Sequence, residues 1–477
     1  MKKLWLVLLS LGLVMAFSVS AFAVDIKVGA DFYVGGLYLN KTNVSAGHPT
    51  QEESYPSTAF FYQRLRVGTD FIVSPSLKLV TRFDAMERIW GGPRSNTWAV
   101  NQDDYYAMSA ETQFENENIA VDVVYIDYTS PIGKFQVGYM PDLDWGTVFG
   151  NYTIDDTLGQ IKWSNSVGPV ILMIDYAKFA DHSSSSVTQN SWWWYDNVMA
   201  QKTDRDSDVY SAGVIYPFKS SKANGEAGIL MRYFRDASNR GDWAGPYLSR
   251  AYIVEPYAKA TIGPVALEAE VNYTWGDAAI GEYGGKNVRL DSLSAYVNAD
   301  AKFGMVRVGG TFAYLQGDDN GDDDVIHDAS TGGVDYNPCL LMFNYDTVNY
   351  WIGGLASNHE GQQVGGPMTN AWFLQGRVGV NPTPQLDLLA SFSWAQADKK
   401  PYAGYGGPYN QYASGDYGWE IDVTGTYKIT NNLSYMLGAG YLFTGNYFKP
   451  DADAYPFPGE FEKQDDFIII NKLTLSF

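Results

Sequence analysis

Apolar and polar residues alternate along most of the chain from residue 25 to its end. In 386–394, for example, apolar side chains fill the even positions, and Asp387, Ser391 and Ser393 stand among the odd ones. The segments 267–275 and 420–429 repeat this pattern. A period of two places one kind of side chain on each face of a β-strand, whereas an amphipathic helix has a period near 3.6. Helical periodicity is almost absent, so the pattern predicts an all-β protein.

Two kinds of connection alternate between the predicted strands. Short turns such as 74–76 and 382–384 alternate with long polar loops such as 91–116 and 317–369. This asymmetry is typical of a single transmembrane antiparallel β-barrel with periplasmic turns and extracellular loops. The alternation breaks at Val123, where we expect a bulge. Eighteen strands are predicted, or 16 if one hairpin is miscounted, at residues 25–40, 57–73, 76–90, 117–130, 133–140, 157–166, 169–180, 206–219, 224–236, 250–263, 264–276, 288–303, 304–316, 370–382, 385–398, 417–430, 432–444 and 465–477.

Alternation alone does not distinguish a membrane barrel from a soluble β-sandwich, but three further features favour the barrel. Aromatic residues on the apolar face lie near strand ends, as a girdle at the lipid interface requires; they include Tyr273, Trp275, Trp394 and Tyr427. The opposite face carries charges of both signs, as expected of a water-filled lumen. The last strand ends at Phe477 and resembles the signal that the barrel-assembly machinery recognises.

The first 23 residues predict export. Lys2 and Lys3 precede an apolar run from residue 4 to residue 20, and Ala21-Phe22-Ala23 has the small-x-small pattern of a signal-peptidase site. We therefore expect a cleaved signal peptide at 1–23 and a barrel domain at 24–477. The alternative, an uncleaved membrane anchor, is disfavoured because the run is marginal for spanning a bilayer.

Composition excludes several functions. The 477 residues include 33 Lys and Arg against 54 Asp and Glu, and the net charge of −21 argues against a nucleic-acid partner. The one cysteine, Cys339, excludes an intramolecular disulfide and a thiolate zinc cluster. All four histidines fall in predicted loops without a Ser or Asp at a catalytic spacing, so we expect no enzyme; they are His48, His182, His327 and His359.

The mature chain resembles Gram-negative outer-membrane porins of the large, 18-stranded kind. The stretch 62–84 carries the similarity most clearly, because it reads as two strands around a tight turn with Arg and Asp on the inward face. The size class includes sugar-specific porins and the alginate-export family. The resemblance implies an outer-membrane channel for passive diffusion of small hydrophilic solutes or ions, surrounded by lipid and lipopolysaccharide, with a homotrimer as a possible assembly. Two alternatives stay open, namely a polysaccharide export channel and the barrel sheath of an electron conduit.

Charged residues on the inward face predict a polar constriction. On two neighbouring strands, alternation points five cations into the lumen: Arg64, Arg66, Lys78, Arg82 and Arg88. Acidic groups are predicted inward on the same wall and elsewhere: Asp70, Asp84, Glu268, Glu270, Glu420 and Asp422. A basic wall facing acidic groups creates a transverse field that orients solutes. The alternative is that these charges only pair with each other, as Arg66 and Asp84 can.

The third long loop, 141–156, has the composition of a segment that narrows a pore. It contains apolar anchors in Trp145 and Phe149 and carboxylates in Asp142 and Asp144. Folding inward buries the anchors and directs the acids toward the lumen. The alternative is a lid that packs on neighbouring loops outside the barrel.

Two other loops contain candidate binding residues. The run Trp192, Trp193, Trp194 and Tyr195 suits stacking on sugar faces, although such a run also packs loops together. Asp318, Asn320 and Asp322 have the first three spacings of a calcium loop, but Gly321 stands too early and Ala329 replaces the closing Glu. A solvated acidic loop is the alternative. No other cofactor is predicted.

Overall fold

A computed structural model of the chain describes most of the predicted barrel. The described residues are 24–44, 56–91, 119–143, 145–149, 157–181, 204–241, 247–282, 285–318, 324–329, 332–333, 335–355, 364–400, 414–448 and 463–477. Several predictions concern positions outside these residues, namely the signal peptide at 1–23, Asp144, Trp192, Trp193, Trp194, Tyr195, Asn320 and Asp322.

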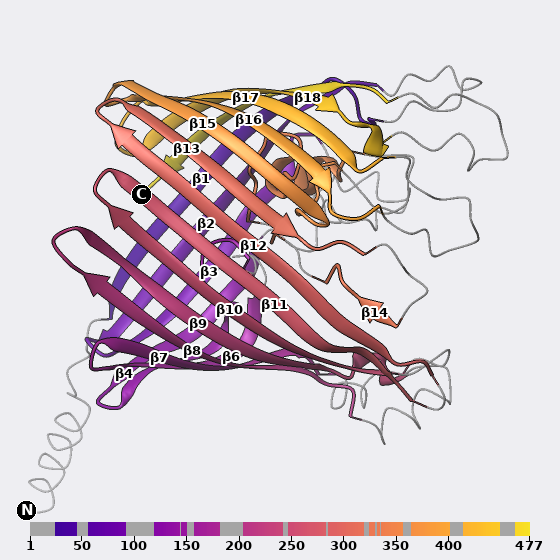
Figure 1. Ribbon diagram of the computed structural model, residues 1–477. Coiled ribbons are helices and arrows are strands. Elements are labelled where there is room, and N and C mark those ends of the chain that lie inside the picture. Colours follow the sequence, from indigo (N-terminus) through magenta and orange to yellow (C-terminus); the bar gives the residue numbers. More distant parts are fainter. Residues whose placement is uncertain are drawn as a thin grey trace, which may run out of the picture.

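Eighteen antiparallel strands form a closed barrel (Figure 1). Each strand pairs with its sequence neighbours, and β1 closes the barrel by pairing with β19. The number of strands and the all-β architecture confirm the prediction. The strands are β1 (Asp25–Leu39), β2 (Thr58–Ser74), β3 (Leu77–Ile89), β4 (Ile119–Ser130), β5 (Gly133–Pro141), β6 (Thr157–Val167), β7 (Val170–Ala180), β8 (Ser207–Lys219), β9 (Ala223–Asp236), β10 (Tyr247–Ile262), β11 (Val265–Gly281), β12 (Val288–Phe303), β13 (Val306–Leu315), β15 (Ala371–Thr383), β16 (Leu386–Ala397), β17 (Asp416–Lys428), β18 (Leu433–Thr444) and β19 (Asp466–Ser476).

A few short elements lie outside the barrel wall. β14 (Val325–Ile326) belongs to the connection between β13 and β15 and runs parallel to the beginning of β12. Two 3-10 turns, η3 (Ser238–Gly241) and η5 (Asn446–Phe448), follow β9 and β18. The connection between β13 and β15 also holds one π-helical turn, η4 (Tyr345–Asn349), and α3 (Tyr350–Ile352). Among the described residues, no helix is long and apolar enough to span a bilayer.

Alternate side chains of each strand point out of the barrel and into it. In β17, Ile421 and Val423 are 41% and 53% exposed, whereas Glu420 and Asp422, which alternate with them, are buried. Large apolar side chains therefore cover the outside, and polar ones fill the inside. This is the reverse of a soluble β-barrel, and it is the arrangement that a lipid exterior and a wet interior favour.

A bulge interrupts the pairing of β3 with β4. Arg82 pairs with Val123 and Phe83 with Val121, so the register skips Asp122. Val123 is then buried and Val124 is 42% exposed. The extra residue explains why the alternation breaks at this point, and it confirms the predicted bulge.

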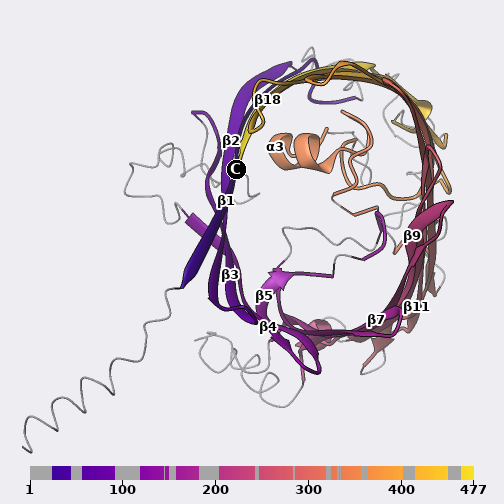
Figure 2. The ribbon, with the colours of Figure 1, turned by 90° about the vertical axis from the view of Figure 1, so that its left-hand side faces the viewer.

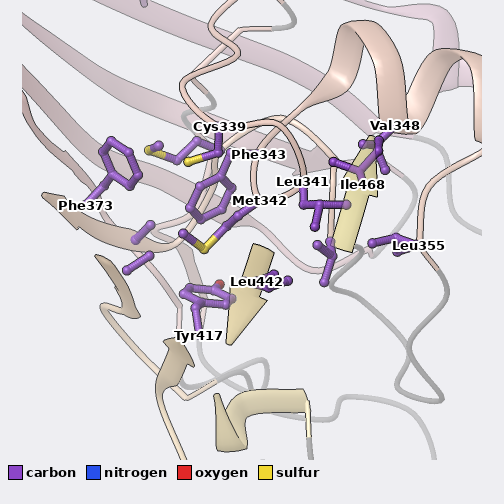
Figure 3. Packing of buried hydrophobic residues seen from close by; sticks show 14 of the residues in the cluster. Cys339, Leu341, Met342, Phe343, Val348, Leu355, Phe373, Tyr417, Leu442 and Ile468 are labelled. Atoms are coloured by element: carbon purple, nitrogen blue, oxygen red, sulfur yellow. The ribbon is translucent and has the colours of Figure 1, made fainter. Parts of the chain in front are cut away.

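Two connections fold into the barrel (Figure 2). One is the described part of the loop between β5 and β6, residues 141–143 and 145–149, which we call loop 3. The other is the segment 335–355, with η4 and α3, which we call the inner segment. The inner segment packs Leu341, Met342 and Phe343 against β15, β17, β18 and β19 (Figure 3). The largest apolar core of the protein therefore lies inside the barrel.

Candidate functional site

The predicted basic residues of β2 and β3 line one wall of the lumen, and carboxylates lie beside them. Arg66 makes two contacts with Asp84, from Nε to Oδ1 at 2.8 Å and from Nη2 to Oδ2 at 2.6 Å. The two residues are directly opposite in the register, as the sequence suggested. Lys78 donates to Asp70 at 2.7 Å. The wall is thus a set of cross-strand ion pairs, and the side chains of Arg66 and Asp84 are only 18% and 11% exposed.

Sequence reasoning missed two carboxylates that pair with arginines of this wall, because irregularities in the strand pairing bring them to the lumen side. Arg82 donates from Nη2 to Asp122 at 2.5 Å, and Asp122 is the residue that the β3–β4 register skips. Arg64 pairs with Glu87 at 3.5 Å next to Met86, whose φ of 52° turns the end of β3. Strict alternation points Glu87 away from the lumen. The interrupted alternation at Val123 was the one sequence signal that pointed to either carboxylate, because it marked the bulge at Asp122. The fifth predicted cation, Arg88, is buried, but the residues inserted at Met86 and Glu87 pair it with Gln63, so it shares the outward face of the strands with Gln63 and does not join Arg64 in the lumen.

Loop 3 crosses the lumen and is attached to the opposite wall. The indole Nε1–H of Trp145 donates to the Glu255 carbonyl of β10 at 2.9 Å, and its ring packs edge-on against Tyr257. Phe149 makes a similar edge contact with Tyr296 of β12. The apolar anchors identified from the sequence are therefore the residues that hold loop 3 inside the barrel.

The acidic residues of this region do not face the pore as expected. Asp142 forms a buried ion pair with Arg232 of β9, with Arg232 Nη2 at 3.0 and 2.8 Å from the two carboxylate oxygens. Glu270 accepts hydrogen bonds from Thr147 N and Oγ1, both at 2.5 Å, and from Val148 N at 2.8 Å. Burying a carboxylate is costly without such partners. Asp142 and Glu270 therefore fasten loop 3 and do not supply an acidic face of the lumen.

The inner segment is fastened in the same manner, and sequence reasoning missed it. Glu420 of β17 accepts three backbone N–H groups, from Leu340 at 3.0 Å, Leu341 at 2.8 Å and Met342 at 2.7 Å. Glu420 is fully buried, so it too differs from the predicted pore acid. The signal that could have revealed the insertion is the apolar run 339–343 in an otherwise polar loop.

The far end of the inner segment reaches the basic wall. The Trp351 ring of α3 lies 4.6 Å from the Tyr62 ring of β2, and Tyr62 contacts Tyr33 of β1 edge-on. The Arg64 guanidinium lies over the Tyr33 ring at 5.2 Å. The inner segment thus spans the lumen from β17 to β2 and narrows it beside Arg64.

Cys339 lies at the start of the apolar run and is buried. Its thiol is surrounded by the apolar core, and Glu420 and Asp422 are near. Burial, with a smaller contribution from these carboxylates, raises the pKa of the Cys339 thiol. A thiol in this setting is protonated and unreactive at neutral pH.

A cavity of about 550 Å³ lies in the lumen beneath the inner segment. Tyr296 and Tyr336 form part of its lining, together with Arg377 of β15. Arg377 donates to Asn298 Oδ1 at 2.5 Å, Thr311 Oγ1 at 2.5 Å and Asp300 at 3.0 Å. A Cβ at residue 309 would meet Asp300 at 2.0 Å, so glycine at that position makes room for the pair. Sequence reasoning did not single out Arg377 or Asp300.

The remaining predicted acids and the predicted calcium loop contribute less to the candidate site in the lumen. Glu268 is half-buried on β11, and Asp422 is buried near Ser391, whose hydroxyl donates to it at 3.4 Å. Asp318 accepts the backbone N–H of His327 at 3.1 Å. Within the described part of the chain, no group of three or more His, Cys, Asp or Glu side chains is placed to hold a metal ion.

No family model and no curated protein matches the chain. Among solved structures, the chain is similar to OpdK of Pseudomonas aeruginosa with vanillate, at 14% identity and a TM-score of 0.49, over 94% of this chain and 99% of that chain. A BenF-like porin from Pseudomonas fluorescens Pf-5 has 11% identity and a TM-score of 0.47, with the same coverage. OmpF of Salmonella typhi in complex with daunomycin has 11% identity and a TM-score of 0.39, over 96% of this chain and 99% of that chain.

Proposed function

We propose that this chain forms a passive outer-membrane channel for small hydrophilic solutes or ions in a Gram-negative bacterium. The observation that carries the proposal is a closed barrel with an apolar exterior and a charged lumen, narrowed by two fastened segments. Such a barrel provides a polar path through a bilayer without any chemical step. Diffusion down a concentration gradient then needs only that the solute fits and is weakly bound.

The exterior supports the membrane location. The barrel strands contain 9 to 17 residues each, and a tilted strand needs about 9–11 residues to cross the hydrocarbon core. The predicted signal peptide at 1–23 and the terminal Phe477 are consistent with export and with assembly by the barrel machinery. The long loops then face the exterior and the short turns face the periplasm.

The lumen favours small solutes over a polymer or a protein guest. Loop 3 and the inner segment occupy space that a multihaem cytochrome would need, so the sheath of an electron conduit is disfavoured. A polysaccharide export channel needs a long strip of one charge sign. The β2–β3 wall instead alternates cations with carboxylates, as in the pairs Arg66–Asp84 and Lys78–Asp70.

We further propose that Arg64, Arg66 and Arg82 orient solutes at the constriction. The side chains of Arg66 and Arg82 are 18% and 14% exposed, so their ion pairs are partly desolvated and their fields are weakly screened. Because Glu270 and Glu420 bind loop 3 and the inner segment, and Asp142 is paired with Arg232, the acidic side of the lumen field is weaker than the sequence suggested. The basic wall should therefore dominate selectivity.

Liposome swelling tests the proposal. Proteoliposomes should swell in isotonic solutions of small neutral sugars, with rates that fall steeply as the sugar grows, because two segments narrow the lumen. Empty liposomes and liposomes with heat-denatured protein are the controls. Swelling no faster than in the controls would contradict a passive channel.

A further inference from the structure

A row of aromatic rings runs around part of the outside of the barrel, near the end with the long loops. Tyr176, Tyr210, Tyr233, Tyr252 and Trp275 belong to five consecutive strands, β7 to β11, and each is directly opposite the next in the register. Neighbouring ring centroids lie 5.0–6.3 Å apart. The rings form a continuous band that spans about 20 Å at the usual strand spacing.

A row of charged residues lies directly above this band. Two residues closer to the long loops on each strand, the register aligns Lys178, Asp208, Arg235, Arg250, Asp277 and Arg289, from β7 to β12. Because side chains two residues apart share a face, these residues point outward like the rings. The outer surface therefore changes from apolar to aromatic to charged within a few residues along each strand.

The two halves of the charged row differ. On β7–β9, Lys178 pairs with Asp206 at 2.7 Å, and Arg235 pairs with Asp204 at 2.6 Å. On β10–β12, Arg250 and Arg289 flank Asp277 and are exposed. In the described part of the chain, neither of these two guanidinium groups has an ion pair or a hydrogen bond. This half of the row therefore presents two exposed guanidinium groups that no described side chain neutralises.

Like charges are also placed face to face. Arg235 and Arg250 are direct cross-strand partners, and like charges in that arrangement repel each other. Asp204 compensates Arg235, whereas Arg250 has no ion pair of its own among the described residues. Two strand spacings separate Arg250 from Arg289, which is about 10 Å. Guanidinium groups at this separation match two phosphates of one molecule, and each can bind a phosphate through two parallel hydrogen bonds.

We propose that the outer face of β7–β12 binds a phosphorylated glycolipid of the outer leaflet. Its phosphates contact Arg250 and Arg289, and its acyl chains lie on the aromatic band and the apolar surface beneath it. The proposal rests on the outer-membrane location, but it does not require that the channel conducts.

Native mass spectrometry of the detergent-solubilised full-length protein tests this site. The probes are a bis-phosphorylated diglucosamine lipid and the same lipid without phosphates. We compare the wild type with the double variant Arg250→Ser/Arg289→Ser. The matched control is Lys219→Ser/Lys428→Ser, which removes two exposed cations close to the short turns.

The wild type and the control should hold the phosphorylated lipid equally, and the double variant should bind it at least about tenfold more weakly. Removal of the phosphates should weaken wild-type binding by a similar factor. Equal binding by the double variant, or equal binding of the two lipids, would overturn the proposal. So would a wild-type assembly in which copies of the chain cover this face and exclude lipid. Conductance measured on the same samples separates loss of this site from loss of the channel.

Discussion

Asp142 and Arg232 lie 90 residues apart in the sequence and form an ion pair whose side chains are 2% and 3% exposed. Arg232 projects from β9, and Asp142 follows directly after β5. A buried pair of this kind adds little net stability, but removal of one partner leaves an uncompensated charge. The main effect of the pair is therefore to fix the position of loop 3, and its net contribution to the stability of the barrel is smaller.

The first prediction concerns this pair. Arg232→Met should loosen loop 3 and lower the free energy of unfolding by about 3 kcal/mol, because Asp142 stays buried without its partner. Urea unfolding in detergent and single-channel current noise measure the two effects. The double variant Asp142→Asn/Arg232→Met should recover most of the stability. If Arg232→Met has the same current noise and the same free energy of unfolding as the wild type, the proposed role of the pair is contradicted.

The second prediction concerns the tip of loop 3. Glu270→Ala removes the acceptor of three hydrogen bonds from Thr147 and Val148, each worth about 1.5–3 kcal/mol when one partner is charged. We expect frequent transitions to a higher conductance as the loop leaves the lumen. Glu268→Ala is the matched control, because Glu268 is a lumen-facing residue on the same strand and makes no hydrogen bond or ion pair with the described part of loop 3. Identical current traces for the two variants would show that Glu270 does not hold the loop.

The third prediction uses Cys339 as a reporter for the inner segment. Maleimide labelling of the folded wild type should be slow at pH 8, since the thiol is buried and its pKa is raised. The rate should keep increasing at pH values where an ordinary thiol has already ionised, because the thiolate forms only at higher pH. Unfolded protein should show the ordinary profile. Rapid labelling at pH 7 would be incompatible with the buried site.

The fourth prediction tests the carboxylate that fastens this segment. Glu420→Ala should raise the labelling rate of Cys339 at least about tenfold, because it removes the three hydrogen bonds that hold residues 340–342. Glu420→Gln should give a smaller increase, since the amide oxygen still accepts hydrogen bonds. If the alanine variant labels as slowly as the wild type, apolar packing alone holds the segment.

The fifth prediction concerns selectivity. Arg66→Ser/Arg82→Ser removes two positive charges from the wall and leaves Asp84 and Asp122 without their arginine partners. The reversal potential under a salt gradient should shift toward cation selectivity. The control Lys219→Ser lies next to a short turn and should not change it. An unchanged reversal potential in the double variant would remove these arginines from the constriction.

The barrel itself was predictable because each strand meets lipid on one side and water on the other. The alternation of apolar and polar residues within each strand therefore indicates which side chains face lipid and which face the lumen. The 18 predicted strands correspond to the strands of the barrel wall. The Arg66–Asp84 pair was predictable for the same reason, since both residues lie in a regular hairpin.

The interior was less predictable because its contacts are not local. Asp122 and Glu87 reach their partners through bulges, which shift a side chain from one face to the other. Glu270 and Glu420 lie at polar positions of regular strands, but their partners belong to loops more than 70 residues away. The path of a loop across a lumen leaves no periodic signal. Only the apolar residues of that loop, such as Trp145 and the run 339–343, indicate that it is buried.

The most direct test of the channel is single-channel conductance of the purified barrel in a planar bilayer, with the reversal potential taken under a salt gradient. We predict steady, ohmic conductance of the size of a narrow porin and a reversal potential that the basic wall biases toward anions. A closed or barely conducting barrel would contradict the passive channel, and it would favour an exporter that opens only with a partner.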